Sequence, residues 1–266
     1  MTSREYLLYW SLKFQGDWDK IYEAVSQKTE VDEKELKSVI SKYTGNYITA
    51  LDRYDYPDSL LRATKPPFVI YYIGDISLIS DKHNKLAVVG SRKFSEYGKE
   101  VTERFVSKLC KDFVIVSGLA IGIDSIAHTT ANNNGGKTVA VLGNGIDFIY
   151  IKENRELYEE LCRKQLVISE YPPGTQPQQD NFPVRNRIIV ALSQNVLVTE
   201  GKLKSGTQIT AGLMAMKGGG VCCVPTRIGE ESICNLLISE GAFLVETPED
   251  VYEVAGVVSK RPVFEN

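Results

Sequence analysis

The chain has 266 residues, of which 43% are hydrophobic and 24% are charged, and its 31 basic and 34 acidic side chains give a formal net charge of -3. This composition is that of an ordinary globular protein, and it excludes a disordered chain and a general basic surface for nucleic acid. No secretory signal opens the chain and no apolar run approaches the roughly 20 residues that span a bilayer, so we expect a cytoplasmic protein without a membrane partner.

The first part of the chain predicts a small helical domain. Apolar residues recur at helical spacings up to about residue 45, and charged and glycine-containing breaks separate them into short helices. Residues 45–80 contain Pro57, Pro66 and Pro67, and a β-branched and aromatic run at 68–73 predicts a strand. We place the domain boundary between about 75 and 85, which predicts an N-terminal helical domain with its connecting segment over 1–78.

A regular alternation of strands and helices begins at Leu86. The predicted strands are Leu86–Val89, Phe113–Val116, Thr138–Leu142, Leu166–Ile168, Val196–Val198, Gly220–Val224 and Phe243–Val245. The predicted helices between and after them are 95–111, 122–133, 154–165, 186–193, 207–217, 232–240 and Pro248 to about Val254. This order predicts an α/β fold with a doubly wound, mostly parallel sheet over 79–256, followed by a tail at 257–266.

Small and polar residues collect where the predicted strands end, which is where such sheets bind ligands. The residues concerned are Gly90, Ser91, Ser117, Gly118, Gly143 and Asn144. Because glycine lets backbone N–H groups approach an anion, these loops predict a phosphate cradle, although each glycine could also serve only a tight turn. The dinucleotide and Walker fingerprints are absent from the chain.

Basic side chains follow the same strands. The candidates for phosphate contact are Arg92, Lys93, Lys152, Arg155, Arg185, Asn186, Arg187, Lys202 and Lys204. An arginine presents several donors in a rigid fork that suits phosphate oxygens. The alternatives are solvated surface charges for the lysines, and internal ion pairs that brace a loop for Arg92 and for the 185–187 cluster.

Nothing in the sequence predicts catalysis, a metal or another cofactor. The five cysteines are irregularly spaced, which favours reduced structural thiols, and neither histidine lies in a catalytic pattern. One alternative is a nucleotide-processing hydrolase that uses the same phosphate cradle with Glu200 and Asp124 as its acids. Another is an interaction module whose cradle stays empty.

Several motifs together resemble the DprA/Smf family of DNA-processing proteins. They occur in order over about residues 50 to 252 and include Val88-Val89-Gly90-Ser91-Arg92, Ser117-Gly118-Leu119-Ala120, Ser169-Glu170-Tyr171-Pro172-Pro173-Gly174 and Phe182-Pro183-Val184-Arg185-Asn186-Arg187. The resemblance implies an extended Rossmann-like domain that binds single-stranded DNA and forms a homodimer. It also implies a recombination mediator, without enzymatic activity, that loads the RecA recombinase onto incoming strands in natural transformation, with single-strand-binding protein as a further candidate partner.

The resemblance also implies roles for particular residues. It assigns phosphate contact to Arg92, and it places basic positions of the site at Lys152 and Arg155. It assigns the dimer interface to the segment that contains Leu237 and Ile238, with Leu244 beyond it. Aromatic residues in or beside the loops, namely Phe148, Tyr150 and Tyr171, could stack on bases or pack in the core.

Overall fold

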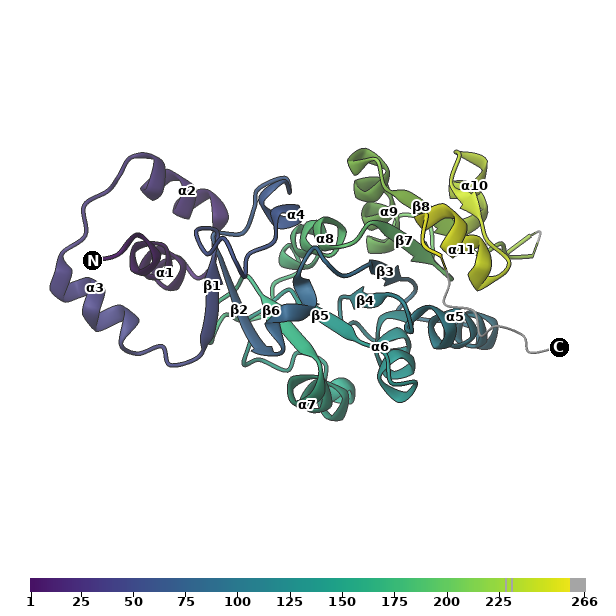
Figure 1. Ribbon diagram of the computed structural model, residues 1–266, viewed down its shortest axis with the longest axis horizontal. Helices are drawn as coiled ribbons and strands as arrows, with labels where there is room; N and C mark the ends of the chain where they lie inside the picture. The colour runs from purple at the N-terminus through teal and green to yellow at the C-terminus, as the bar shows by residue number, and fades with distance from the viewer. Residues whose placement is uncertain (228, 231, 259–266) are drawn as a thin grey trace. The chain divides into compact units, whose positions relative to one another are not determined.

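A computed structural model describes residues 1–227, 229–230 and 232–258 of the chain (Figure 1). These residues form two compact units: unit 1 combines Met1–Lys82 with Val139–Leu192, and unit 2 combines His83–Thr138 with the chain from Ser193 onward. The units follow contacts in space, so they do not coincide with the predicted domain boundary near residue 78, which stays a prediction. The predicted tail at 257–266 lies, from residue 259 on, outside the described residues.

Unit 1 begins with the helices α1 (Ser3–Lys13), α2 (Trp18–Ser26) and α3 (Glu33–Ile40). Each has a side chain that caps its N-terminus, provided in turn by Thr2, Asp17 and Asp32. The apolar faces of these helices meet in a small core of their own, which consists of Tyr9, Trp10, Ile21, Ala24 and Leu36. The predicted helical character of this segment is therefore confirmed.

The sheet of unit 1 combines antiparallel and parallel strands. Its strands are β1 (Asn46–Thr49), β2 (Val69–Gly74), β6 (Leu166–Ser169) and β5 (Thr138–Leu142), in the spatial order β1-β2-β6-β5. The β1–β2 and β2–β6 pairs are antiparallel, and the β6–β5 pair is parallel. The segment predicted to connect two domains thus belongs to a sheet, because the β-branched and aromatic run of β2 pairs with β6.

Short helices complete unit 1. These are α4 (Asp58–Leu61), the 3₁₀ turns η1 (Ile76–Ile79) and η2 (Lys152–Asn154), α7 (Arg155–Lys164) and α8 (Asn181–Leu192). Contacts join α7 to β2 and β6, and α4 to α8. The segment from the end of β5 to the start of α7, together with α8, holds the candidate residues of this unit.

The strands of unit 2 are all parallel, as predicted. They are β3 (Lys85–Val89), β4 (Val114–Ser117), β7 (Asn195–Val198), β8 (Gly220–Cys223) and β9 (Phe243–Leu244), in the spatial order β4-β3-β7-β8-β9. The helices are α5 (Glu96–Leu109), α6 (Ile123–Asn133), α9 (Gly206–Lys217), α10 (Ile233–Ser239) and α11 (Pro248–Ala255). The predicted doubly wound α/β class is confirmed.

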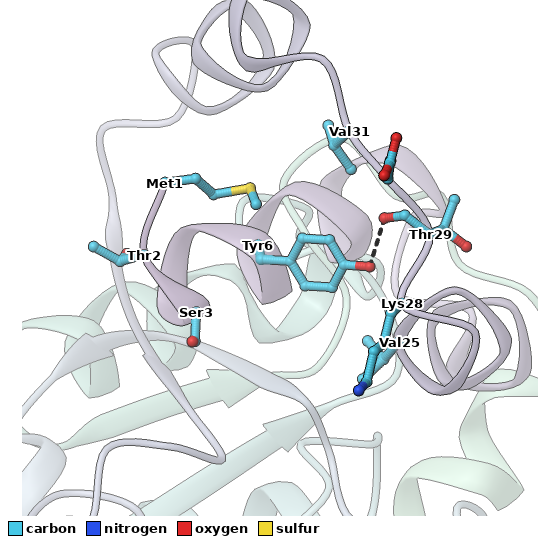
Figure 2. A pocket seen from close by; sticks show the side chains of 9 residues that line it. Met1, Thr2, Ser3, Tyr6, Val25, Lys28, Thr29 and Val31 are labelled. Atoms are coloured by element: carbon cyan, nitrogen blue, oxygen red, sulfur yellow. Dashed lines mark hydrogen bonds between the residues drawn. The ribbon is translucent and has the colours of Figure 1, made fainter.

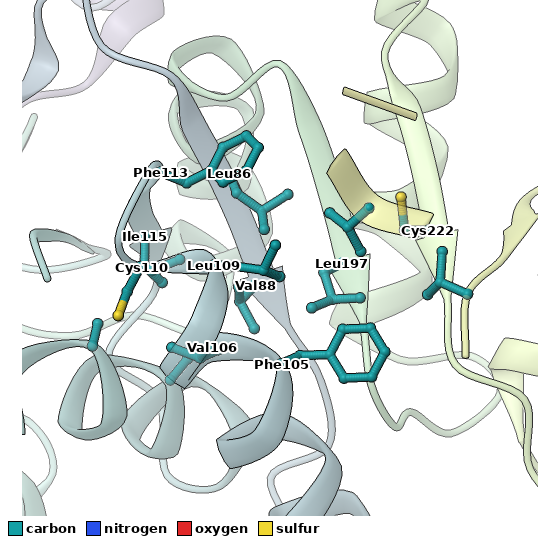
Figure 3. Close-up of a cluster of buried hydrophobic side chains, with 14 of the residues drawn as sticks. Leu86, Val88, Phe105, Val106, Leu109, Cys110, Phe113, Ile115, Leu197 and Cys222 are labelled. Carbon is teal, nitrogen blue, oxygen red and sulfur yellow. The ribbon is translucent and has the colours of Figure 1, made fainter. Parts of the chain in front are cut away.

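The core of unit 2 fixes the ends of these strands. Figure 3 shows side chains from β3, α5 and β7 pointing into one cluster, among them Val88, Phe105 and Leu197, all at most 1% exposed. Cys222 of β8 packs in the same cluster, as a small apolar residue does. All five cysteines are free thiols. A core of this density holds the loops after β3, β4 and β7 in fixed positions.

Candidate nucleic-acid interface

The carboxyl ends of β3, β4 and β7 bring three loops of unit 2 together. The backbone N–H of Ser91, after β3, donates to the carbonyl of Glu200, after β7, at 2.9 Å. The carbonyl of Ser91 accepts from the N–H of Ile123, the first residue of α6 after the β4 loop, at 3.1 Å. The predicted Gly-Ser-Arg loop is thus held between its two neighbours by backbone hydrogen bonds.

Two glycines make this close approach possible. Any side-chain carbon on Gly122 would collide with the carbonyl of Ser91 and the backbone of Arg92, and Gly122 itself has a φ of 91°. A side-chain carbon on Gly90 would lie 2.6 Å from the Glu200 carbonyl. Both positions therefore require glycine for packing, which is the turn function that sequence analysis weighed against a phosphate contact.

The Gly-Ser-Arg loop presents two basic side chains at the surface. The Ser91 hydroxyl donates to the Lys93 carbonyl at 2.6 Å and accepts from the Lys93 N–H at 3.2 Å. These two bonds fold the loop into a tight turn with Ser91 buried and with Arg92 and Lys93 exposed. Of the predicted site residues on this loop, Ser91 shapes it, and Arg92 and Lys93 face solvent.

The loop after β4 uses its polar groups internally. The Ser117 hydroxyl is fully buried and donates to the carbonyl of Val88 at 2.6 Å. The N–H of Gly118 donates to a carboxylate oxygen of Asp124 at 3.1 Å. Ser117 and Gly118 therefore hold β4 and the loop before α6 in place, and their predicted contact with phosphate stays a prediction.

Carboxylates occupy the N-termini of two helices at this edge of unit 2. Glu200 accepts from the N–H of Ser95 at 3.0 Å and from its hydroxyl at 2.8 Å, at the start of α5. Gly98 lies so close that a side-chain carbon there would collide with the Glu200 carboxylate. Asp124 lies in the first turn of α6. These internal anions interact with the partial positive charge at each helix start, where the sequence predicted room for phosphate.

The loop after β7 carries exposed lysines before the start of α9. Lys202 and Lys204 are both exposed, and the Ser205 hydroxyl donates to the Lys202 carbonyl at 2.6 Å. The Lys204 N–H donates to the side chain of Gln208 at 3.0 Å. The helix α9 then begins at Gly206 without a hydrogen bond from the side chain of its N-cap residue. The exposed cations of this loop therefore neighbour Arg92 and Lys93 on the adjoining loop.

In unit 1, the loop after β5 is braced from within. Asn144 is 3% exposed, and its side-chain amide donates to the carbonyls of Gly145 at 3.0 Å and Phe148 at 2.7 Å. Gly143 packs against the ring of Phe182. Gly143 and Asn144 thus build the loop, and their predicted contact with phosphate stays a prediction.

The arginines of α8 are buried and are engaged within unit 1. Arg187 is 8% exposed and binds Glu170 through both ends of its guanidinium, at 2.8 and 2.6 Å. Burial raises the pKa of the Glu170 carboxyl, and the Arg187 charge opposes that shift. Arg185 is 4% exposed and donates to the carbonyl of Val141 and to the side chain of its buried neighbour Asn186. These contacts match the internal bracing that sequence analysis gave as the alternative for this cluster.

Exposed cations of unit 1 lie instead at the start of α7. Lys152 and Arg155 are both exposed, and Arg155 forms a long ion pair with Glu159, at 3.9 Å. Two residues before Lys152, the half-exposed ring of Tyr150 packs against Phe182, with ring centroids 5.3 Å apart. This segment therefore offers two cations beside an accessible aromatic ring.

The residues proposed for a dimer interface lie at the far edge of the sheet of unit 2. Leu237 and Ile238 are partly buried in α10. Leu244 lies in β9, the edge strand, and is 49% exposed, and its neighbour Phe243 is 51% exposed. An apolar edge of this kind is suited to a partner surface, and its role in assembly stays a prediction.

Two pockets of the described chain lie away from these loops. One, of about 460 Å³, lies beside α1 and is lined by Met1, Tyr6 and Val25 among others, with the Tyr6 hydroxyl donating to the Thr29 carbonyl at 2.8 Å (Figure 2). Another, of about 310 Å³, lies beside Phe113 at the opposite end of β4.

Over the part of the chain that the structure describes, no cluster of His, Cys, Asp or Glu is placed to hold a metal ion. None of the helices within the described ranges has the length and hydrophobicity to cross a bilayer.

Sequence comparison relates this chain to known proteins. Residues 46–256 match the sequence model of a family described as "DNA recombination-mediator protein A". The chain is 41% identical over 224 residues to the DNA processing protein DprA of Streptococcus pneumoniae, an alignment that covers 84% of this chain and 78% of the relative. It is 36% identical over 237 residues to DprA of Bacillus subtilis, with 86% of this chain and 80% of the relative covered.

Solved structures agree with the sequence relatives. The crystal structure of DprA from Streptococcus pneumoniae superposes with a TM-score of 0.79 at 33% identity, over 95% of this chain and 98% of that one. A structure of DNA processing protein A from Helicobacter pylori, described in terms of its single-stranded DNA binding mode, gives a TM-score of 0.71 at 30% identity. It covers 79% of this chain and 95% of its own.

Proposed function

We propose that this chain, which belongs to the DNA recombination-mediator protein A (DprA/Smf) family, binds single-stranded DNA by contacting its phosphates with exposed basic side chains. The Helicobacter pylori relative is described as binding single-stranded DNA, and 30% of the aligned residues are identical. The net charge of -3 means that any site for a polyanion must be local. The exposed cations at the strand ends supply such a local site.

The observation that carries the proposal is the pair of adjoining cationic loops in unit 2. Arg92 and Lys93 are exposed on the loop after β3, and Lys202 and Lys204 are exposed on the loop after β7. The Ser91–Glu200 backbone hydrogen bond joins these loops. Since Glu200 is already engaged with Ser95, its charge is partly compensated, and the exposed charged groups of the two loops are cations.

In unit 1, the proposal assigns phosphate contact to a separate set of residues. Lys152 and Arg155 are exposed at the start of α7, where a helix N-terminus adds a partial positive charge. Arg185 and Arg187 are assigned a supporting role, because their guanidinium groups are buried and bonded to protein acceptors. They hold the start of α8 and the loop after β5 in place.

Two further parts of the proposal concern partners. We assign homodimer formation to α10 and β9, on the support of the exposed apolar side chains of Phe243 and Leu244. Membership of a recombination-mediator family supports a role in handing single-stranded DNA to RecA, past single-strand-binding protein, during natural transformation. The free cysteines are compatible with the reducing cytoplasm, where this handover would take place.

The proposed function is non-catalytic. The hydrolase alternative needs Asp124 and Glu200 as acids, and both carboxylates already accept hydrogen bonds, Asp124 from the Gly118 N–H and Glu200 from the Ser95 N–H. A carboxylate that is engaged with backbone donors in this way is poorly placed to transfer protons to a ligand. The geometry therefore favours a binding protein over a nucleotide hydrolase.

A salt titration tests the proposed site. Fluorescence anisotropy with a labelled oligothymidylate would measure affinity at several salt concentrations for the wild type, Arg92→Glu and Arg104→Glu. Arg104 is an equally exposed arginine on α5 and serves as the matched control. We expect Arg92→Glu to weaken binding and to reduce the slope of log affinity against log salt by about 0.7 for each phosphate that the variant no longer binds. Unchanged binding by Arg92→Glu would reject the assignment of the site.

A further inference from the structure

Each of the three adjoining loops of unit 2 exposes one large apolar side chain. Phe94, after β3, is 41% exposed; Ile121, after β4, is 41% exposed; and Leu203, after β7, is 46% exposed. Residues two or three positions nearer the strands are buried in each loop, namely Ser91, Leu119 and Gly201. The loops therefore present apolar groups to solvent at the same edge of unit 2 where they present cations.

The backbone segments that carry these three side chains contact one another. Phe94 follows Arg92 by two residues, and the backbone of Arg92 packs directly on Gly122, the residue after Ile121. Leu203 follows Glu200 by three residues, and the Glu200 carbonyl is bonded to the Ser91 N–H at 2.9 Å. Along the chain, Phe94 is next to Lys93, and Leu203 lies between Lys202 and Lys204. Apolar and cationic groups are thus interleaved in two of the three loops.

We propose that Phe94, Ile121 and Leu203 form a base platform, a surface that contacts the nucleobases of a bound strand and makes the site select single-stranded over duplex DNA. This inference rests on the proposed function, because it assigns a second component to the same site. The interleaved cations identify the occupant: a ligand that satisfies both sets of groups carries an anion and an apolar face in each repeating unit, as a single strand does.

A site that contacts base faces selects single-stranded DNA because a duplex buries those faces. Phosphate contacts depend on charge and are available on single and double strands alike. The faces of the bases are stacked on one another inside a duplex and are accessible only in a single strand. Phe94 can stack on a base, and Ile121 and Leu203 can pack against base edges and sugars. A site with cations alone would bind both forms of DNA, whereas the base platform adds affinity for the single strand only.

An oligomer without bases separates the two components. The experiment measures the affinity of the full chain, by fluorescence anisotropy, for three ligands of equal length: oligothymidylate, an abasic strand with the same phosphates, and a duplex. The variants are Phe94→Ala, the double variant Phe94→Ala with Leu203→Ala, and the control Tyr54→Ala. Tyr54 is a fully exposed aromatic residue in unit 1, outside these loops.

We expect Phe94→Ala to weaken oligothymidylate binding by about tenfold, the value typical of losing one stacked base, and to leave the abasic and duplex affinities nearly unchanged. The double variant should lose more, and Tyr54→Ala should bind all three ligands as the wild type does. Equal losses on oligothymidylate and on the abasic strand, or no loss on either, would overturn the base platform while leaving the phosphate site intact. A wild-type chain that binds none of the three ligands would instead refute the proposed function itself.

Discussion

Replacing Glu170 by glutamine removes the ionic partner of a guanidinium that is 8% exposed. The side chain of Glu170 is itself 5% exposed, and the pair is joined by two charge-assisted hydrogen bonds of 2.8 and 2.6 Å. Glutamine keeps one acceptor and places an N–H against the guanidinium, so Arg187 stays buried with its charge uncompensated. Removing one member of a buried pair costs about 3–5 kcal/mol, and we expect Glu170→Gln to lower the free energy of unfolding by this amount.

Urea denaturation followed by circular dichroism measures this loss, with the m-value checked for two-state behaviour. A companion variant, Glu170→Leu with Arg187→Met, removes both charges, and we expect its stability to lie within about 1 kcal/mol of the wild type. Because Arg187 acts inside the fold, this companion should also bind oligothymidylate as the wild type does. A loss below about 1 kcal/mol in Glu170→Gln, or a companion that folds but no longer binds DNA, would refute the internal role of Arg187.

Three further changes test other parts of the structure. Gly122→Ala puts a side-chain carbon against the Ser91 carbonyl at a φ of 91°. We therefore expect it to lower the free energy of unfolding by about 1–3 kcal/mol and to weaken oligothymidylate binding. Wild-type stability together with wild-type binding would contradict the packing of Gly122 on this loop. Phe105→Ala should cost about 3–5 kcal/mol in urea denaturation, since Phe105 is 1% exposed in the core of unit 2, and a loss under 1 kcal/mol would show a poorly packed core. The N–H groups of Glu246 and Thr247 hold the pKa of Asp250 below its usual value, so its charge stabilises the fold above the unfolded pKa of about 4. Asp250→Asn should therefore be less stable by about 0.5–1 kcal/mol at pH 7, and this difference should vanish as the pH falls through the folded pKa; a constant difference across that range would exclude the linkage.

The strands of unit 2 were predictable because their signal is local. A strand that is buried on both faces is continuously apolar, and the predicted runs at Leu86–Val89 and Val196–Val198 coincide with β3 and β7 to within one residue. The place of β2 was not predictable in this way. Its strand character is visible in the sequence, but its pairing of Tyr71 with Ser169 joins residues that are far apart in the chain. Nothing in the sequence of β2 or of β6 indicates that these two strands pair with each other.

The environment of individual side chains in the candidate site could not be predicted from the sequence either. Residue type and position after a strand predicted phosphate contact for both Arg92 and Arg187, but the two have opposite environments, one exposed and the other buried against Glu170. The role of each arginine depends on which groups lie beside it, and the acidic partner of Arg187 comes from another loop. The Glu200–Ser95 contact at the start of α5 was missed for the same reason, although the serine three residues before Gly98 is a usable signal of a helix start.

The carboxylates of Glu200 and Asp124, which accept from the backbone N–H groups of Ser95 and Gly118, have a consequence for how this protein can vary. Because Glu200 and Asp124 accept from backbone donors of these loops, the loops are held in place without any ligand. In the proposed site, contact with an external polyanion depends on exposed side chains, such as those of Lys93, Lys202 and Lys204, which contribute little to folding. Affinity can therefore be raised or lowered among descendants of this sequence by single surface replacements, while the architecture beneath them stays unaltered.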